Sequence, residues 1–156
     1  MAADRIEREI EIDAPIDVVW AVISEPEHIT GWFTDSAELE ARPGGEGRFG
    51  WEVKATNRKR VVNLRVERLD PPHFFSFRWD YPDGDDPTEK NAPLVEFSLE
   101  ERGGSTRLRL VESGLEKIAR SEEAKETYFA EHTRGWATIV ERLRDYAPTQ
   151  RSILAG

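Results

Sequence analysis

The sequence predicts an α+β domain, in which a curved antiparallel sheet of about six to seven strands wraps around one long C-terminal helix. Three observations predict it. Apolar and polar residues alternate over most of the stretch from residue 49 to residue 110, which is the period of half-buried strands. Two short helical patterns follow the first strand, and a longer helical pattern covers residues 120–146. This order matches neither an alternating βαβ fold nor a pure β-sandwich.

The N-terminal elements are a strand and two short helices. Ile6, Ile10 and Ile12 share one parity between acidic residues, which predicts a strand with one buried face that Arg8 interrupts. Pro15 then starts a helix, because proline suits the first helical position. A second proline at position 26 interrupts this helix, so we expect a second short helix within an elbow over residues 25–33.

Five segments of alternating hydrophobicity follow, at residues 49–53, 62–66, 75–79, 95–99 and 106–110, and a weaker one lies near residues 37–41. Turn-forming residues such as Pro43-Gly44-Gly45, Asp70-Pro71-Pro72 and Gly103-Gly104 separate them, and a longer loop spans residues 78–90. The strands therefore form an antiparallel meander with one polar face and one apolar, strongly aromatic face.

The last element is one long amphipathic helix. Its apolar stripe consists of Phe129, His132, Trp136, Ile139, Val140 and Leu143. At about 1.5 Å per residue the helix is roughly 40 Å long, enough to cross a sheet. Pro148 ends it, so we expect a single domain over residues 1–147 and a flexible C-terminal tail over residues 148–156. Gly135 costs this helix about 1 kcal/mol relative to alanine, and we expect a closely packed neighbour to offset that cost.

Several short motifs occur in the order and spacing of a known family. They are Ala14-Pro15 with Val19-Trp20, Ile29-Thr30-Gly31-Trp32-Phe33, Pro43-Gly44-Gly45-Glu46-Gly47-Arg48-Phe49, Glu112-Ser113-Gly114 and Gly135-Trp136 with Leu143. The match spans roughly residues 5–147. The chain resembles the START-like (SRPBCC, Bet v 1-like) domains, in particular the AHSA1-like branch named after the activator of Hsp90 ATPase. The resemblance implies the helix-grip fold, whose members range from co-chaperones to lipid carriers and cyclases.

Composition excludes several classes of function. The 22 Lys and Arg residues against 31 Asp and Glu residues give a net charge of −9, so nucleic acid is not expected as a partner. The absence of cysteine excludes disulfides, thiolate nucleophiles and cysteine-ligated metals. No apolar run approaches the roughly 20 residues of a membrane span, and the N-terminus lacks a signal peptide's apolar core. We therefore expect a cytoplasmic protein without membrane insertion.

No motif predicts a cofactor or a metal. The segment Gly45-Glu46-Gly47-Arg48-Phe49-Gly50 fits the G-x-G-x-x-G pattern, but a strand follows it where a dinucleotide site needs a helix. The three histidines, His28, His73 and His132, lie far apart in the sequence without the spacing of a metal site. We therefore expect neither a cofactor nor a metal, and the sequence assigns no catalytic residue.

The predicted function is the binding of a small apolar, aromatic or lipid-like molecule in a cavity between the sheet and the C-terminal helix. The residues expected to face this ligand point inward and are Trp32, Phe49, Trp51, Leu64, Phe75, Phe77, Trp79, Phe97, His132 and Trp136. The same rings would also fill an ordinary aromatic core. In that case His132 would be a core histidine, hydrogen-bonded to a backbone carbonyl or to a buried side chain.

Two other functions stay open. A co-chaperone that stimulates an ATPase, as the family's name implies, would bind a chaperone or another protein through its acidic outer faces and would need no cavity. An enzyme of the cyclase or hydratase type would use the same cavity, with His132 and a carboxylate such as Glu52 as candidates. Glu52 has the parity of the outer face, so only a β-bulge would turn it inward.

Overall fold

In the computed structural model, which describes residues 5–53, 55, 57–79, 88 and 90–154, a seven-stranded sheet wraps around one long helix. The predicted α+β architecture is confirmed. In chain order the elements are β1 (Arg5–Ile12), α1 (Ile16–Ser24), α2 (Pro26–Ile29), β2 (Ser36–Leu39), β3 (Glu46–Val53), β4 (Arg58–Asp70), β5 (Phe74–Trp79), β6 (Leu94–Arg102), β7 (Ser105–Ser113), η1 (Leu115–Lys117), α3 (Glu122–Tyr146) and η2 (Ala147–Leu154).

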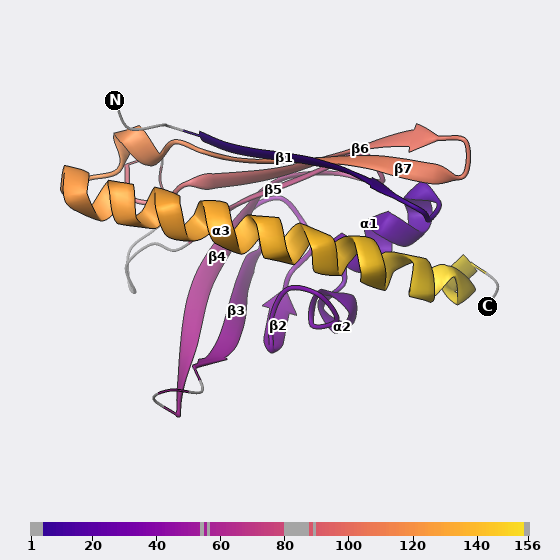
Figure 1. Ribbon diagram of the computed structural model, residues 1–156, viewed down its shortest axis with the longest axis horizontal. Coiled ribbons are helices and arrows are strands. Elements are labelled where there is room, and N and C mark those ends of the chain that lie inside the picture. Colours follow the sequence, from indigo (N-terminus) through magenta and orange to yellow (C-terminus); the bar gives the residue numbers. More distant parts are fainter. Residues whose placement is uncertain (1–4, 54, 56, 80–87, 89, 155–156) are drawn as a thin grey trace.

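The strand order in the sheet is β1-β7-β6-β5-β4-β3-β2, and every neighbouring pair is antiparallel. The sheet is strongly curved, so that β3 and β4 extend away from β1, β6 and β7 and leave α3 between the two halves (Figure 1). The two edges are β1 and β2, and β2 is only four residues long. The order of elements thus places the concave face of the sheet against α3.

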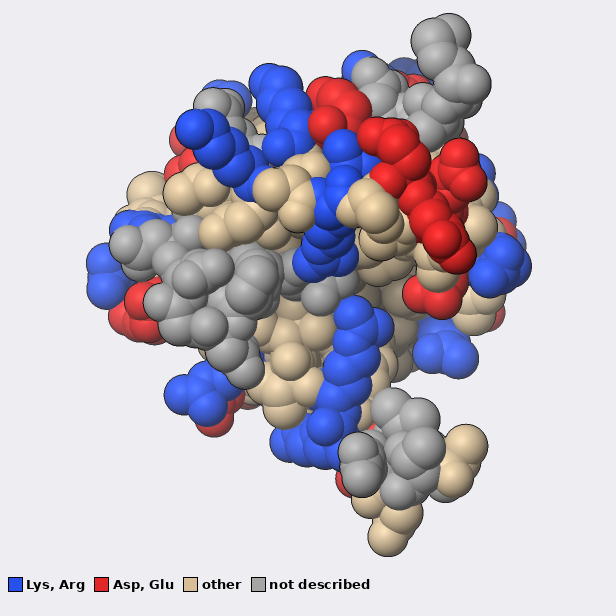
Figure 2. Space-filling model, turned by 90° about the vertical axis from the view of Figure 1, so that its left-hand side faces the viewer, with Lys and Arg blue, Asp and Glu red and all other residues tan. Residues whose placement is uncertain are grey.

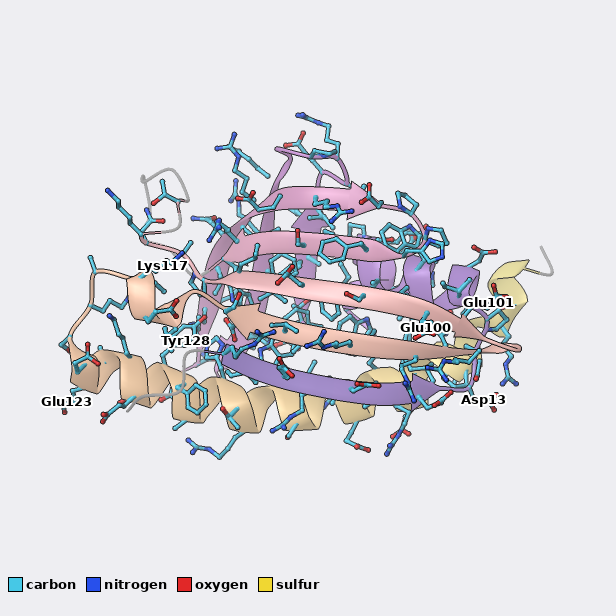
Figure 3. The ribbon with its side chains drawn as sticks, turned by 90° about the horizontal axis from the view of Figure 1, so that it is seen from above. Asp13, Glu100, Glu101, Lys117, Glu123 and Tyr128 are labelled. Atoms are coloured by element: carbon cyan, nitrogen blue, oxygen red, sulfur yellow. The ribbon has the colours of Figure 1, made fainter. Side chains whose placement is uncertain are left out.

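Alternation along the strands separates a polar outer face from an apolar inner face, as the sequence predicts. On the outer face, Arg109 pairs with Glu7 at 3.1 Å and Arg107 pairs with Glu9 at 3.0 Å, both between β7 and β1. Figure 3 shows this face, with charged side chains along the strands and at both ends of the sheet. On the inner face, Phe75, Phe77 and Phe97 are almost completely buried and contact one another.

Helix α3 begins with a side-chain cap, because the Ser121 hydroxyl accepts a hydrogen bond from the Ala124 backbone N–H at 3.1 Å. Arg8, which interrupts the apolar pattern of β1, donates to the backbone carbonyl of Thr133 at 3.2 Å and so ties β1 to the middle of α3. None of the helices among the described residues is long and apolar enough to cross a membrane.

The chain continues beyond α3 as helical structure. Residues 147–154 form η2, which packs against α1, and Ala147 is fully buried. Arg151 pairs with the Asp13 carboxylate at 2.8 Å. The sequence predicts a flexible tail over residues 148–156; the structure shows helical turns up to Leu154 that pack against α1, and the flexibility of the tail stays a prediction. The domain boundary at residue 147 stays a prediction. The loop predicted over residues 78–90 lies mostly outside the described residues.

The glycine-rich segment leads into β3, so a strand follows it, as the sequence predicts. A Cβ atom on Gly45 would lie 2.2 Å from the backbone oxygen of Glu40, and one on Gly47 would lie 2.7 Å from the backbone oxygen of Glu38. Gly45 also accepts a hydrogen bond from the Val66 N–H at 2.8 Å. These glycines therefore allow the turn before β3 to pack directly on its neighbours.

Gly45→Ala is expected to lower the free energy of unfolding by about 1–3 kcal/mol, because backbone atoms that cannot swing away surround the new methyl group. Urea denaturation of both proteins measures the change. Ala41→Gly, at an exposed position of the same turn, is the control and should stay within about 0.5 kcal/mol of the parent. Equal midpoints for Gly45→Ala and the parent would contradict the close approach.

Candidate functional site

A carboxylate lies in the apolar interior, at the end of β7. Glu112 shares the inward parity of Leu108 and Leu110, and its direct neighbours in the ladder are Ile6 on β1 and Val95 on β6. Only 3% of the residue is exposed. A charged group in such a place is stable only if hydrogen bonds replace its lost hydration.

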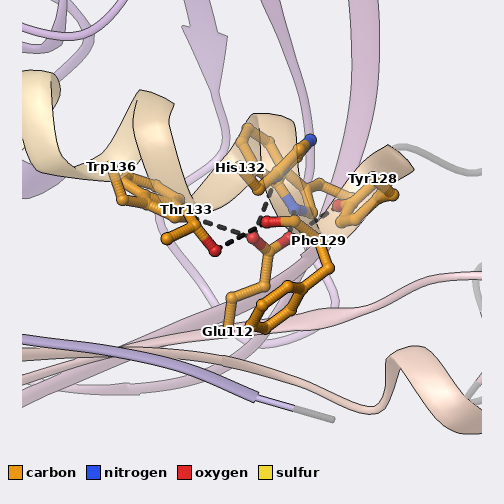
Figure 4. Close-up of polar contacts among 7 residues, drawn as sticks. Glu112, Tyr128, Phe129, His132, Thr133 and Trp136 are labelled. Carbon is orange, nitrogen blue, oxygen red and sulfur yellow. Dashed lines mark hydrogen bonds and ion pairs between the residues drawn. The ribbon is translucent and has the colours of Figure 1, made fainter. Parts of the chain in front are cut away.

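Four donors surround the Glu112 carboxylate (Figure 4). One oxygen, Oε2, accepts from Tyr128 Oη at 2.6 Å and from Trp79 Nε1 at 2.7 Å. The other, Oε1, accepts from Trp136 Nε1 at 2.9 Å and contacts His132 Nδ1 at 2.9 Å. An ionised carboxylate offers about four lone-pair positions, so the four donors match its full capacity.

The donors decide the ionisation of this carboxyl group. Burial by itself would raise the pKa of Glu112, but the hydrogen bond and positive charge of His132, together with the hydrogen bonds from Tyr128 and Trp136, hold that pKa below its usual value. Glu112 is therefore a carboxylate at neutral pH. Because a carboxylate only accepts hydrogen bonds, Nδ1 of His132 carries a proton and donates a hydrogen bond to Glu112.

His132 lies between the buried carboxylate and the surface. Its ring stacks on Tyr128 with 3.7 Å between the centroids and meets Trp79 edge-on at 5.5 Å. Of its side chain, 14% is exposed. The second ring nitrogen, Nε2, points away from Glu112 (Figure 4). His132 is thus hydrogen-bonded to Glu112 and also lines the cleft described next.

That cleft lies between α3 and strands β3, β4 and β5, and it has a volume of about 290 Å³. We call it the aromatic cleft. Its apolar walls are mainly rings, namely Phe33, Trp51, Val62, Trp79, Trp136 and Ile139. Its other lining residues are Arg60, Glu131, His132 and Gly135. Hydrogen bonds hold two of the walls in place. Trp51 Nε1 donates to the backbone carbonyl of Phe33 at 2.9 Å, and Trp136 Nε1 donates to the Glu112 carboxylate.

Gly135 corrects one expectation from the sequence. No atom lies within 4 Å of the position that a Cβ on Gly135 would take, apart from the helix's own backbone and chain neighbours, so no strand or helix packs closely there. The residue instead lines the aromatic cleft. The missing side chain therefore leaves space beside His132 and Trp136. Nothing offsets the lower helix propensity of glycine at this position, so the open space comes with a loss of helix stability.

A second, polar depression adjoins the aromatic cleft at its charged end. This polar groove, with a volume of about 470 Å³, shares Arg60, Glu131 and His132 with the cleft and adds the first turns of α3, including Arg120 and Glu123. Figure 2 shows this end of the molecule, where Lys and Arg side chains run in a line down the face and acidic side chains gather along one side.

The structure places the ten predicted ligand residues in two groups. Trp51, Trp79, His132 and Trp136 line the aromatic cleft together. The other six are packed in the core, and these are Trp32, Phe49, Leu64, Phe75, Phe77 and Phe97. For example, Trp32 Nε1 is bonded to the Val22 carbonyl at 2.9 Å, and its ring contacts Phe97. A ligand in the cleft as it stands would therefore meet only the first group.

Two charged residues of the site are missing from the predicted set, although the sequence contains a signal for each. Glu112 continues the inward parity of Leu108 and Leu110, and Arg60 continues the inward parity of Val62 and Leu64. A charge at an inward position of a strand is unusual and often functional. Glu52 is exposed, as its outer parity predicts, and the carboxylate that His132 contacts is Glu112.

Metal ligands are sparse in the described part of the chain. One group, Glu25, Glu27 and His28, brings its ligand atoms within 4.8 Å of one another on the surface around α2. Two of its members are exposed carboxylates, and His28 Nδ1 is already 3.0 Å from Tyr146 Oη. Exposed acidic groups of this kind are common without an ion, so the group adds nothing to the site.

A curved antiparallel sheet around a C-terminal helix, with a cleft at their junction, defines the chain as a helix-grip domain of the SRPBCC type. It belongs to the family described as activator of Hsp90 ATPase homolog 1-like proteins, whose sequence model matches residues 13–147. No curated protein matches the chain in sequence at a significant level.

Solved structures share the fold at low sequence identity. The protein MLL2253 from Mesorhizobium loti superimposes with a TM-score of 0.73 at 19% identity, covering 93% of this chain and 97% of that one. The Aha1 protein from Colwellia psychrerythraea, solved as a dimer, gives 0.72 at 17% identity, covering 92% and 95%. DynU16, a protein encoded in the dynemicin biosynthetic locus, gives 0.72 at 22% identity, covering 95% of this chain but only 48% of its own length.

Glu112→Gln is expected to lower the free energy of unfolding at neutral pH by roughly 2–5 kcal/mol, because an amide leaves buried donors unpaired. The variant should also lack the part of the free energy of unfolding that depends on ionisation of Glu112 and therefore changes with pH in the acid range. Since the pKa of Glu112 is lowered in the folded protein, the contribution of this carboxylate to stability is complete above its ordinary pKa of 4.5 and disappears as the pH falls through the folded pKa.

Urea denaturation from pH 7 down to the acid limit of the fold measures both effects. Glu100→Gln, at an exposed position of β6, is the control and should behave like the parent at every pH. A Glu112→Gln variant with the stability and pH profile of the parent would show that the carboxylate is not ionised inside the fold.

Proposed function

We propose that this protein binds a small apolar or aromatic molecule in the aromatic cleft between the sheet and α3. The observation that carries the proposal is the arrangement around Gly135. A mid-helix glycine faces open space, and the indoles of Trp51, Trp79 and Trp136 line that space with Phe33. A fold under no demand for this space would gain stability by filling it with a side chain.

The size of the cleft limits the molecule. An apolar cavity of roughly 150 Å³ holds one benzene, so about 290 Å³ suits a compound of one or two rings. This is the lower end of ordinary ligand pockets, which begin at roughly 300 Å³. Affinity would come mainly from apolar burial, at about 25 cal/mol per Å². A lipid-like chain fits less well than a flat ring, because the walls are themselves mainly flat rings.

The cleft also bears on the two alternative functions. A co-chaperone acting through its outer faces would need no cavity, and it would have no use for the gap beside Gly135. The family name suggests such a role, and the Aha1 protein from Colwellia psychrerythraea shares the fold, but at 17% identity this likeness concerns the fold alone. Small-molecule binding is the proposal that uses the features of the interior.

Native mass spectrometry of the freshly purified protein tests the proposal, together with Gly135→Leu. We expect a co-purified small molecule on the parent protein and none on the variant, since the leucine side chain fills the cleft. The same variant should be more stable by up to about 1 kcal/mol, because leucine is a far better helix former than glycine.

The opposite directions of the two effects make the test specific, because a variant that merely misfolds would lose stability together with binding. Ala137→Leu, at an exposed position of α3, is the matched control and should keep the bound molecule. If the parent carries nothing, titration of its tryptophan fluorescence with naphthalene and indole replaces the first reading. Binding of neither compound, or equal binding by Gly135→Leu, would contradict the proposal.

A further inference from the structure

We propose that the aromatic cleft and the polar groove form one binding site for a two-part molecule, an aromatic ring that carries an uncharged, hydroxyl-rich tail such as a sugar. The ring lies in the cleft and the tail lies in the groove. The inference rests on the proposed function and adds to it the chemical class of the ligand, an aromatic glycoside.

One row of residues on α3 forms a wall of both depressions. In the polar groove the row consists of Ala124, Thr127 and Glu131, and in the aromatic cleft Gly135 and Ile139 continue it. These residues are three or four positions apart, so they lie above one another on one face of the helix. At 1.5 Å per residue the row is roughly 22 Å long. The cleft and the groove are therefore two parts of one path along α3.

The two parts differ in size and in polarity. The cleft, of about 290 Å³, is lined mainly by rings and suits one or two rings of a ligand. The groove, of about 470 Å³, is larger, and its lining includes the charged side chains of Arg120 and Glu123 and the hydroxyl groups of Ser121 and Thr127. A substituent too large for the cleft can extend into the groove, because the two share walls. A molecule with one apolar end and one polar end uses both.

The charges along the groove balance, which favours an uncharged tail. Its arginine and glutamate side chains are equal in number, and they are Arg60, Arg120, Glu123 and Glu131. The remaining charged group, His132, is paired with the Glu112 carboxylate at 2.9 Å. Figure 2 shows both signs of charge at this end of the molecule. A carboxylate on the tail would be repelled by the glutamates, and an ammonium group would be repelled by the arginines.

Hydroxyl groups match such a lining. Each hydroxyl can donate one hydrogen bond and accept others, so it can bond to guanidinium, carboxylate and hydroxyl side chains alike without adding a net charge. Ser121 and Thr127 offer hydroxyl groups at exposed positions of this wall. The Ser121 oxygen accepts from the Ala124 N–H, and that bond does not use the proton of the Ser121 hydroxyl. A sugar tail can therefore bond to the groove while the ion pairs of the protein stay as they are.

Isothermal titration calorimetry with 4-nitrophenyl β-glucoside and 4-nitroanisole tests the inference on the whole protein at neutral pH. The two probes share the nitrophenyl ring and its ether oxygen, and they differ only in carrying a sugar or a methyl group. We expect the glucoside to bind about tenfold more tightly, which corresponds to two or so additional hydrogen bonds of ordinary strength.

Two further probes test the charge of the tail. They are 4-nitrophenoxyacetate, whose tail is an anion, and 2-(4-nitrophenoxy)ethylammonium, whose tail is a cation. We expect both to bind about as tightly as 4-nitroanisole and more weakly than the glucoside. An anionic or a cationic probe that binds more tightly than the glucoside would overturn the assignment of an uncharged tail.

Ala124→Leu tests whether the tail lies in the polar groove. The larger side chain occupies part of the groove, and leucine is a good helix former, so we expect the variant to fold. The ratio of the two affinities, glucoside against 4-nitroanisole, should fall from about ten to about one. Ala130→Leu, at an exposed position of α3 outside the lining of both depressions, is the matched control and should keep the ratio of the parent. An unchanged ratio in Ala124→Leu would overturn the placement of the tail.

The outcomes separate this inference from the proposed function. Equal binding of the glucoside and 4-nitroanisole by the parent protein would overturn the two-part site and leave the aromatic cleft as a ligand site. Binding of none of the probes would overturn both. The comparison of probes on the parent protein gives this answer even if Ala124→Leu does not fold.

Discussion

The carboxylate of Glu112 is the interaction on which the arrangement of sheet and helix depends. It stands on β7, and its donors come from Trp79 on β5 and from three successive turns of α3, at Tyr128, His132 and Trp136. Apolar contacts are not directional and would tolerate a helix that slides or rotates. The four hydrogen bonds do not, because a small shift of α3 would break several of them at once and leave a buried charge unpaired.

The same carboxylate also organises the cleft. Two of its donors, Trp79 and Trp136, are walls of the aromatic cleft, and a third, His132, is its polar boundary. The side chains that a ligand would meet are therefore held in place before it binds. Binding then does not carry the entropic cost of ordering them. The cost of burying one charge in the interior thus contributes both to the position of the helix and to a rigid binding surface.

Sequence alone predicts the fold well and the site only in part, for a definite reason. Alternation fixes which face of a strand is buried, and this assigns the sheet, its aromatic inner face and the helix across it. It does not say where along a strand the helix moves away from the sheet. Phe77 and Trp79 have the same parity, yet only Trp79 lies where α3 and the curved strands separate.

The charged residues of the site show the same limit of sequence-based prediction. Parity alone points to Arg60 and Glu112, since both stand among inward-facing apolar residues, but their roles depend on partners that are distant in the sequence. The space beside Gly135 depends on the tertiary structure as well. A glycine that permits a close contact and a glycine that preserves an opening look alike in a sequence, and only the positions of the neighbouring atoms distinguish them.

The edges of the sheet have a consequence for how copies of this protein meet. An open sheet exposes unpaired backbone groups on its outermost strands, which invites strand addition and aggregation. Here one edge, β2, offers only four residues, and the other, β1, carries the exposed carboxylates of Glu7, Glu9 and Glu11. Edge-to-edge strand pairing between two copies is therefore disfavoured at both β1 and β2. The protein can keep an open sheet at high concentration without polymerising through its edge strands.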